Sequence, residues 1–252
     1  MGKINRSVIA ATTLFGMSHL EQIAEGRTFP SEGLVRYYNF DEGSSIFAGD
    51  ATGNHGLIVA DSWTPNGKIN AAYNPNGNSY NSAFRPIGSD VLSINFWMKK
   101  TADWGFYQDI VGTGSSGGSF YLDTAGNQAL VAYFGGGSGN TSFPSDGNYH
   151  MTTLTISDGN QRGYIDGSLE FSLSLPFSFS GNNVRLFGGT GGSLPNNIFN
   201  VDELGIWNRT LNSEEINALY NQGHALPFPA PSAVGLGLVA SGLALKRRRS
   251  KI

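Results

Sequence analysis

The chain lacks cysteine altogether, and charged residues make up only 14% of its 252 residues. Without cysteine it can form no disulfide bond, thiolate metal site or cysteine nucleophile. Long charged helices and coiled coils need many Glu, Lys and Arg residues, so the low charge excludes them. The two predominantly apolar stretches, residues 8–17 and 233–245, are both shorter than the ~20 residues of a typical membrane-spanning helix.

Positive charge is scarce in the body of the chain. Residues 27–229 carry 9 basic and 17 acidic side chains, a net charge of −8, whereas five of the 16 basic residues lie in the last seven positions. An acidic body argues against a nucleic-acid-binding protein, because such a protein needs a basic face. Cations and neutral molecules are the ligands that suit this body.

Glycine and aromatic residues are abundant. The chain has 35 Gly, about twice ordinary usage, together with 16 Phe, 10 Tyr and 4 Trp. So many aromatic side chains argue against intrinsic disorder. Residues 33–223 are short β-branched and aromatic segments separated by Gly, Asn, Asp and Pro, without alternation of strands and helices. This spacing predicts an all-β domain built as a two-sheet antiparallel jelly-roll sandwich.

Two segments show the strand pattern most clearly. In residues 91–98 the even positions are apolar and share one face, while Trp97 lies on the other. Residues 149–156 are rich in β-branched side chains and lead into Ser-Asp-Gly-Asn at 157–160, which predicts a hairpin turn.

One short helix is predicted after the last strand. Asn212 is a good N-cap, and Glu215 three residues later completes a capping box. Ile216 and Leu219 fall on one apolar stripe, and Gly223 is a natural helix end.

The N-terminal segment differs from the middle of the chain. Residues 1–26 combine a short basic start with the apolar stretch 8–17, followed by small residues. This pattern resembles a secretory signal peptide, and a short amphipathic helix is the alternative.

The C-terminal segment, residues 226–252, has three parts in order. Pro229, Ala230 and Pro231 come first, then the apolar stretch, then a basic cluster that contains Arg247, Arg248 and Arg249. A basic cluster that follows a membrane segment stays on the cytoplasmic side, so this one predicts that the body of the chain lies outside the cytoplasm. The order resembles the PEP-CTERM sorting signal, with Pro-Ala-Pro for the commoner Pro-Glu-Pro. The resemblance implies an exosortase-type membrane protease and a precursor anchored in the inner membrane by its C-terminal helix; a plain tail anchor is the alternative.

Five motifs follow one another along residues 27–225. They are Gly-Leu-Val-Arg-Tyr-Tyr-Asn-Phe-Asp-Glu-Gly at 33–43, Asp-Ala-Thr-Gly-Asn-His-Gly at 50–56, Tyr-His-Met at 149–151, Tyr-Ile-Asp-Gly at 164–167, and the closing strand and helix at 201–216. This ordered series resembles the laminin G-like, concanavalin A-like jelly-roll family. The resemblance implies a domain of two packed antiparallel sheets.

A calcium site is part of what the resemblance implies. In that family the loop that matches residues 50–56 and the aspartate of the closing strand can hold a structural Ca²⁺. The matching positions are Asp50, Asn54 and Asp202, which offer the carboxylate and amide oxygens that calcium prefers. The alternative is that Asp50 and Asn54 only shape the turn and that Asp202 caps backbone N–H groups.

Aromatic residues outside the predicted strands are candidates for ligand binding, because sugars stack on aromatic rings. Trp104 and Tyr107 lie in loop-like surroundings and are the candidate stacking residues; ordinary loop packing is the alternative. Trp97 and Trp207 lie in predicted strands and are expected in the core.

The sequence offers few side chains in arrangements that could catalyse a reaction. A catalytic carboxylate pair must face one cleft, whereas Asp202 and Glu203 are neighbours on a predicted strand and are expected to point to opposite faces. The Glu-x-Asp-x-x-Glu pattern of jelly-roll glucanases is absent, and His150 lies inside a predicted strand, where a structural role is expected. We therefore expect a protein without enzymatic activity.

Together these features predict an exported protein of the cell surface or extracellular matrix that binds carbohydrate, such as a matrix polysaccharide. The competing hypotheses are a structural or adhesive surface protein that contacts other proteins, and a degenerate glycoside hydrolase. A stacking aromatic favours the first, a flat apolar patch the second, and a carboxylate pair about 5 to 9 Å apart in a cleft the third.

Overall fold

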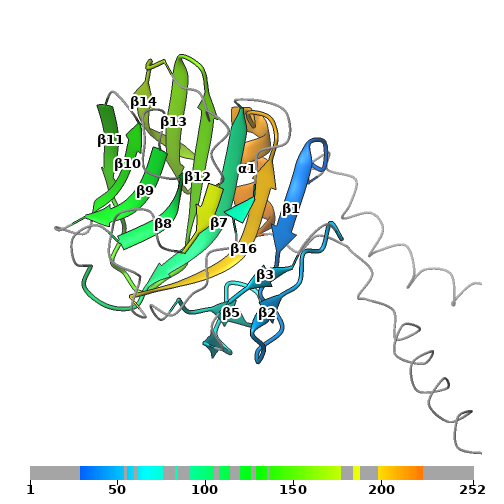
Figure 1. Ribbon diagram of the computed structural model, residues 1–252. Coiled ribbons are helices and arrows are strands. Elements are labelled where there is room, and N and C mark those ends of the chain that lie inside the picture. The colour runs from blue at the N-terminus through cyan, green and yellow to red at the C-terminus, as the bar shows by residue number, and fades with distance from the viewer. Residues whose placement is uncertain are drawn as a thin grey trace, which may run out of the picture.

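The computed structural model describes residues 29–53, 56–59, 62–75, 83–84, 91–104, 108–113, 120–125, 129–134, 137–176, 184–187 and 198–223. Within these residues the chain forms two packed antiparallel sheets, a two-stranded ribbon and a helix (Figure 1). This arrangement confirms the expected all-β sandwich with one short helix near its C-terminal end. No helix of the described residues is long and apolar enough to cross a membrane.

Several predicted features lie outside the described residues. They are the signal-like segment 1–26, the sorting tail 226–252, Asn54 and Tyr107.

The larger sheet has eight strands within the described residues. They are β1 (Leu34–Tyr38), β4 (Trp63–Thr64), β5 (Ala72–Tyr73), β7 (Leu92–Lys100), β12 (His150–Ser157), β13 (Asn160–Ile165), β14 (Ser168–Leu173) and β16 (Phe199–Trp207). The order across the sheet is β14-β13-β12-β7-β16-β5-β4, and β1 also pairs with β16. β16, the last of the described strands, therefore lies in the middle of the sheet.

The smaller sheet has six strands within the described residues. They are β6 (Ala83–Phe84), β8 (Gln108–Thr113), β9 (Phe120–Ala125), β10 (Ala129–Phe134), β11 (Gly137–Ser142) and β15 (Val184–Leu186). Their order is β11-β10-β9-β8-β15-β6. The separate ribbon pairs β2 (Phe47–Ala48) with β3 (Leu57–Ile58).

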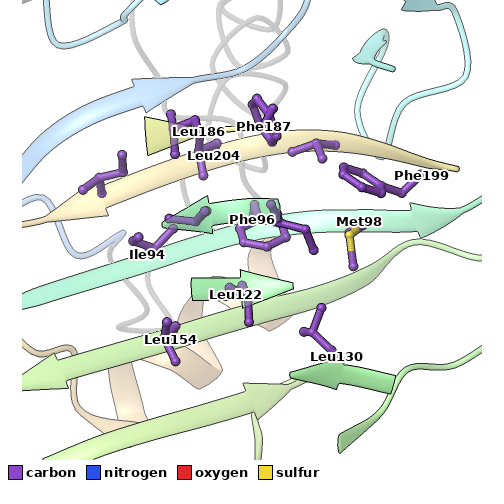
Figure 2. Close-up of a cluster of buried hydrophobic side chains, with 14 of the residues drawn as sticks. Ile94, Phe96, Met98, Leu122, Leu130, Leu154, Leu186, Phe187, Phe199 and Leu204 are labelled. Carbon is purple, nitrogen blue, oxygen red and sulfur yellow. The ribbon is translucent and has the colours of Figure 1, made fainter. Parts of the chain in front are cut away.

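The hydrophobic core lies between the two sheets (Figure 2). Strands alternate their side chains between faces, so β7 sends Ile94, Phe96 and Met98 into this core from the larger sheet. Leu122 and Leu130 meet them from the smaller sheet. The predicted alternation of residues 91–98 is thus confirmed.

A second cluster lies on the outer face of the larger sheet, where the helix α1 (Ser213–Gln222) covers it. Trp97 and Trp207 point to this side and pack with Ile216 and Leu219 of the helix. Figure 1 shows α1 beside β7 and β16, on the side away from β8–β11. Both faces of β7 and β16 are therefore buried, which explains the continuous run of buried residues in β16.

The helix begins and ends as the sequence predicts. Asn212 accepts a hydrogen bond from the backbone N–H of Glu215, and the Glu215 carboxylate accepts one from the backbone of Asn212. Arg209 holds Glu215 with two further hydrogen bonds of 2.8 and 2.6 Å. Gly223 ends the helix in the left-handed conformation at φ 68°, which glycine adopts without strain.

The predicted hairpin at 157–160 is also confirmed. β12 and β13 pair antiparallel, and Ser157 lies opposite Asn160 across a tight turn. The next turn, between β13 and β14, contains Asp166 and Gly167, both with positive φ.

Candidate functional site

The two sheets differ in what covers their outer faces. The helix packs on the larger sheet, whereas no helix of the described residues packs on the smaller one. On β10, Leu130, Ala132 and Phe134 enter the core. The alternate residues Val131 and Tyr133 therefore project from the outer face.

Five residues of β9, β10 and β11 make up a polar surface on this side, which we call the open face: Asp123, Val131, Tyr133, Ser138 and Asn140. Val131 lies opposite both Asp123 and Asn140, and Tyr133 lies opposite Ser138. Asp123 is only 5% exposed, Tyr133 is half-buried, and Ser138 and Asn140 are exposed. Val131 is buried as well, at 8% exposure. The groups of the open face that a ligand can reach are therefore the aromatic ring of Tyr133, the hydroxyl of Ser138 and the amide of Asn140.

These groups have the chemistry that a sugar requires. A hydroxyl and an amide can each hydrogen-bond to sugar hydroxyl groups, and a tyrosine ring can pack against the C–H face of a sugar. None of the five residues is basic. This composition favours a neutral ligand over an anionic one.

Sequence reasoning missed the open face. The segment Ala-Leu-Val-Ala-Tyr-Phe of β10 looks uniformly apolar, so its outward residues do not stand out. The signal that could have found it is the pairing of this segment with polar residues on both neighbouring strands.

Trp104, a predicted stacking residue, lies in the core. It is 5% exposed, its ring centroid is 5.0 Å from that of Phe143, and its Nε1 donates a hydrogen bond to the carbonyl of Ile198 at 3.3 Å. A ring so enclosed presents no open face to a sugar. The contacts of Trp104 fit the packing alternative.

Asp50, a predicted calcium ligand, is bound by nearby protein groups. Its Oδ1 accepts hydrogen bonds from the backbone N–H of Tyr37 at 3.0 Å and of Thr52 at 2.9 Å, and from the Thr52 hydroxyl at 2.8 Å. Its Oδ2 lies 3.8 Å from Nε of Arg36. These contacts fix the turn after β1 and correspond to the turn-shaping alternative.

Asp202 is bound by a different part of the chain. Its Oδ2 accepts a hydrogen bond from the backbone N–H of Ile69 at 2.9 Å, and its Oδ1 accepts one from Glu203 at the same distance. Burial raises the pKa of Asp202 to about 8, although these N–H groups favour the charged form. The turn at 67–70 thus points N–H donors at this carboxyl group, as the capping alternative expects.

The implied calcium ligands are therefore engaged by separate elements. Asp50 accepts hydrogen bonds from β1 and from its own turn, whereas Asp202 accepts one from the β4–β5 turn. Among the described residues, no three His, Asp or Glu side chains form a group that could hold a metal ion. These residues fit a Ca²⁺ ion poorly without further ligands, because backbone N–H groups already bind to the carboxyl oxygens of Asp50 and Asp202.

Glu203 is buried on a bulge of β16 at φ 54°. Its Oε2 accepts a hydrogen bond from the Tyr37 hydroxyl, and its Oε1 has no hydrogen-bond partner. Burial raises the pKa of Glu203 to about 9, so the group is protonated at neutral pH. Asp202 and Glu203 thus bind different elements.

Comparison with known proteins agrees with this architecture. A sequence model of the concanavalin A-like lectin/glucanases superfamily matches residues 74–217. No curated protein matches the chain. Solved structures match the fold at low sequence identity, which by itself carries no statement about activity.

Three solved structures illustrate the likeness. Trypanosoma rangeli sialidase in complex with sialic acid is 17% identical with a TM-score of 0.59; the match covers 77% of this chain but 33% of the sialidase. Domain 4 of AbnA, a GH43 extracellular arabinanase from Geobacillus stearothermophilus, in complex with arabinotriose, is 20% identical with a TM-score of 0.57, covering 74% of this chain and 98% of that domain. The binding domain of Paraclostridial Mosquitocidal Protein 1 is 17% identical with a TM-score of 0.55, covering 75% and 52%.

The chain therefore spans about a third of the sialidase and nearly all of the arabinanase domain. The match of the superfamily covers more than half of the sequence and includes all six described strands of the smaller sheet and five of the eight described strands of the larger one. The chain belongs to the concanavalin A-like lectin/glucanase superfamily.

Proposed function

We propose that this protein binds carbohydrate without cleaving it and that the open face is its ligand surface. The observation that carries the proposal is the combination of Tyr133, Ser138 and Asn140 on neighbouring strands of a sheet face to which no described helix is packed. Binding sites for small ligands typically pair an apolar or aromatic surface with a few polar groups that fix orientation.

The comparisons support this proposal at the level of the fold. The superfamily contains lectins as well as glucanases by its own description. The arabinanase domain, nearly all of which the match covers, was solved with arabinotriose. A sugar ligand is therefore a reasonable expectation for this chain, and its identity is a matter for experiment.

The absence of catalysis is part of the proposal. Hydrolysis of a glycosidic bond uses two carboxyl groups that face one another across the scissile bond. Asp202 and Glu203 are instead bound by the β4–β5 turn and by Tyr37. We expect no release of reducing sugar from any polysaccharide that the protein binds.

A calcium requirement stays a prediction that rests on Asp50, Asn54 and Asp202. The test is the melting temperature of the full chain with Ca²⁺ and with EDTA. A rise with Ca²⁺ that disappears in Asp50→Asn supports the site. Equal melting temperatures under both conditions rule out a calcium contribution to stability.

A second candidate function is contact with another protein. Ile46 and Phe47 are 55% and 53% exposed, next to each other at the start of the β2–β3 ribbon. Adjacent exposed apolar side chains are typical of contact surfaces. This observation supports the adhesive hypothesis, with the ribbon rather than the open face as the contact surface.

We also propose that the protein is exported and that its tail is a sorting signal. The proposal rests on residues 1–26 and 226–252, with their apolar stretches and the terminal arginine cluster. Intact mass of the exported protein tests it. Loss of about 18 residues from the start and of the segment after Pro231 supports it, and an unprocessed chain contradicts it.

The experiment for the main proposal is a glycan-array screen of the full chain, followed by affinity measurement on any polysaccharide class that binds. Tyr133→Ala is the informative variant, and Phe47→Ala is the control on the ribbon. Loss of binding in the first variant alone supports the open face. Loss in the second alone moves the ligand to the ribbon.

A further inference from the structure

The connection between β11 and β12, residues 143–149, is tied to the turn between β13 and β14 through one side chain, His150. Its Nδ1 lies 2.7 Å from Oδ2 of Asp166 in the turn, and its Nε2 lies 2.9 Å from Oδ1 of Asp146 in the connection. Both ring nitrogens therefore face carboxylates.

This geometry can be satisfied only by a protonated ring. An imidazolium has two N–H groups and donates to both carboxylates, whereas neutral imidazole has one N–H and must leave one carboxylate facing a nitrogen lone pair. Partial burial lowers the pKa of His150, but the hydrogen bonds and charges of Asp166 and Asp146 outweigh it and raise the pKa above 6.5. The same hydrogen bond lowers the pKa of Asp146.

The two carboxylates are not equally anchored. Asp166 also accepts the backbone N–H of Met151 at 2.8 Å, and its side chain is 26% exposed. Asp146 otherwise binds only Asn148, within its own turn, and its side chain is 51% exposed. Neutral His150 can donate to one carboxylate, and we expect it to keep the better-anchored Asp166.

The connection leads directly to the open face. Phe143 follows the last residue of β11, and its ring lies 5.7 Å from His150 and 5.0 Å from Trp104. The end of β7 carries two cations: Lys100 is bound to Asp103 at 3.1 Å and to Ser145 at 3.3 Å, and Lys99 lies over the ring of Tyr149. Among the described contacts, Asp146 and Asp166 are the charged groups that bind the imidazole.

We propose that His150 is a pH-sensitive clamp, which holds the β11–β12 connection when protonated and releases it at Asp146 when deprotonated, and which thereby regulates ligand binding on β11. The clamp itself rests on the geometry of His150. The regulation of ligand binding rests on the proposed function of the open face.

The first test measures the clamp without any ligand. The His150 ring is titrated by NMR in the full chain, with His150→Gln to assign its signal. We expect a pKa above the ordinary value in wild type and a lower pKa in Asp146→Asn. The control is Asp103→Asn. It also removes an exposed carboxylate, but one that binds Lys100 and not His150, so the His150 titration should stay unchanged. A wild-type pKa at or below 6.5, or no change in Asp146→Asn, overturns the clamp.

The second test follows the connection by hydrogen exchange. Protection factors correct for the intrinsic pH dependence of exchange, and those of residues 145–149 should fall roughly tenfold as the pH rises through the His150 titration, the loss expected for one charge-assisted hydrogen bond. The β12–β13 turn at 157–160 is the internal control. Unchanged protection of residues 145–149 contradicts release of Asp146.

Glycan affinity measured over the same pH range separates the two proposals. Regulation is supported if glycan affinity falls at pH values above the pKa of His150 in wild type and does not fall in Asp146→Asn. Binding that is independent of pH while the connection loosens overturns the regulatory step alone. A clamp that titrates in a protein that binds no glycan contradicts the proposed function and leaves the clamp standing.

Discussion

The outer faces of the two sheets have opposite characters. On the larger sheet, Trp97 and Trp207 project outwards and are buried by Ile216 and Leu219 of the helix. On the smaller sheet, Tyr133 and Asn140 project outwards and no described helix packs on them. A sheet face that a helix covers can be apolar, whereas polar side chains on a sheet face hydrogen-bond to water, to other protein groups or to a ligand. The helix-covered face holds the domain together, and the open face is the surface on which we propose that a ligand binds.

The largest expected effect is a loss of stability on the covered face. Trp207 is fully buried and its Nε1 donates a hydrogen bond to the carbonyl of Pro30. Replacing a buried tryptophan by alanine leaves a cavity, so Trp207→Ala should lower the free energy of unfolding by about 3–5 kcal/mol, measured by urea denaturation. Molecules that remain folded should bind glycan as wild type does. A change below about 1 kcal/mol would contradict the role assigned to this face.

The next effect concerns the buried acid beside that face. Folded Glu203 keeps its proton up to about pH 9, whereas the unfolded chain loses it near 4.5. The folded state therefore binds more protons in between, and stability falls as the pH rises through this window. Glu203→Gln keeps the shape of the protonated acid and should raise the free energy of unfolding at pH 7 by on the order of 2 kcal/mol.

Melting temperatures of wild type and Glu203→Gln, recorded between pH 4 and 9, provide the measurement. We expect the two curves to converge at the acid end and to separate towards neutral pH. Parallel curves would mean that Glu203 does not titrate differently in the folded and unfolded states.

A smaller effect distinguishes two tyrosines on the two faces. Tyr133 belongs to the open face. Tyr220, a residue of the helix α1 that is 38% exposed, stacks on Trp97 of the covered face. Tyr133→Ala should weaken glycan binding about tenfold, the effect of truncating one aromatic contact residue. Tyr220→Ala should leave the affinity unchanged while lowering stability slightly. Equal affinities for both variants would remove the distinction between the faces.

The smallest effect tests the attachment of the covering helix. Asn212 caps its first turn and shares the capping box with Glu215. Asn212→Ala should cost about 1 kcal/mol of unfolding free energy, and Asn212→Ser, which can still cap, should cost less. Equal losses in both variants would show that the cap does not contribute.

The sequence predicts the covered face better than the open one. Its signals are local: the capping box at Asn212 and Glu215 lies within four residues, and the even and odd positions of residues 92–98 identify both faces of β7. The ordered motifs then indicate the fold. Each of these signals needs only neighbouring positions, because helix caps and strand alternation are short-range.

The open face depends on pairing between strands, which single segments do not reveal. Asp123, Val131 and Asn140 become neighbours only through the register of β9, β10 and β11. Trp104 shows the reverse difficulty: its sequence surroundings are those of a loop, and tertiary packing against Phe143 encloses it. Asp50 and Asp202 match a motif, but the N–H groups that bind them come partly from distant segments.

The most direct test of the account is the affinity of the full chain for glycan, measured side by side for wild type, Tyr133→Ala and Tyr220→Ala. We expect wild type and Tyr220→Ala to bind a neutral polysaccharide, with a dissociation constant about tenfold higher for Tyr133→Ala. Folding of each variant is checked by its melting curve. Binding that survives in Tyr133→Ala and fails in Tyr220→Ala would place the ligand on the helix-covered side and contradict the central claim.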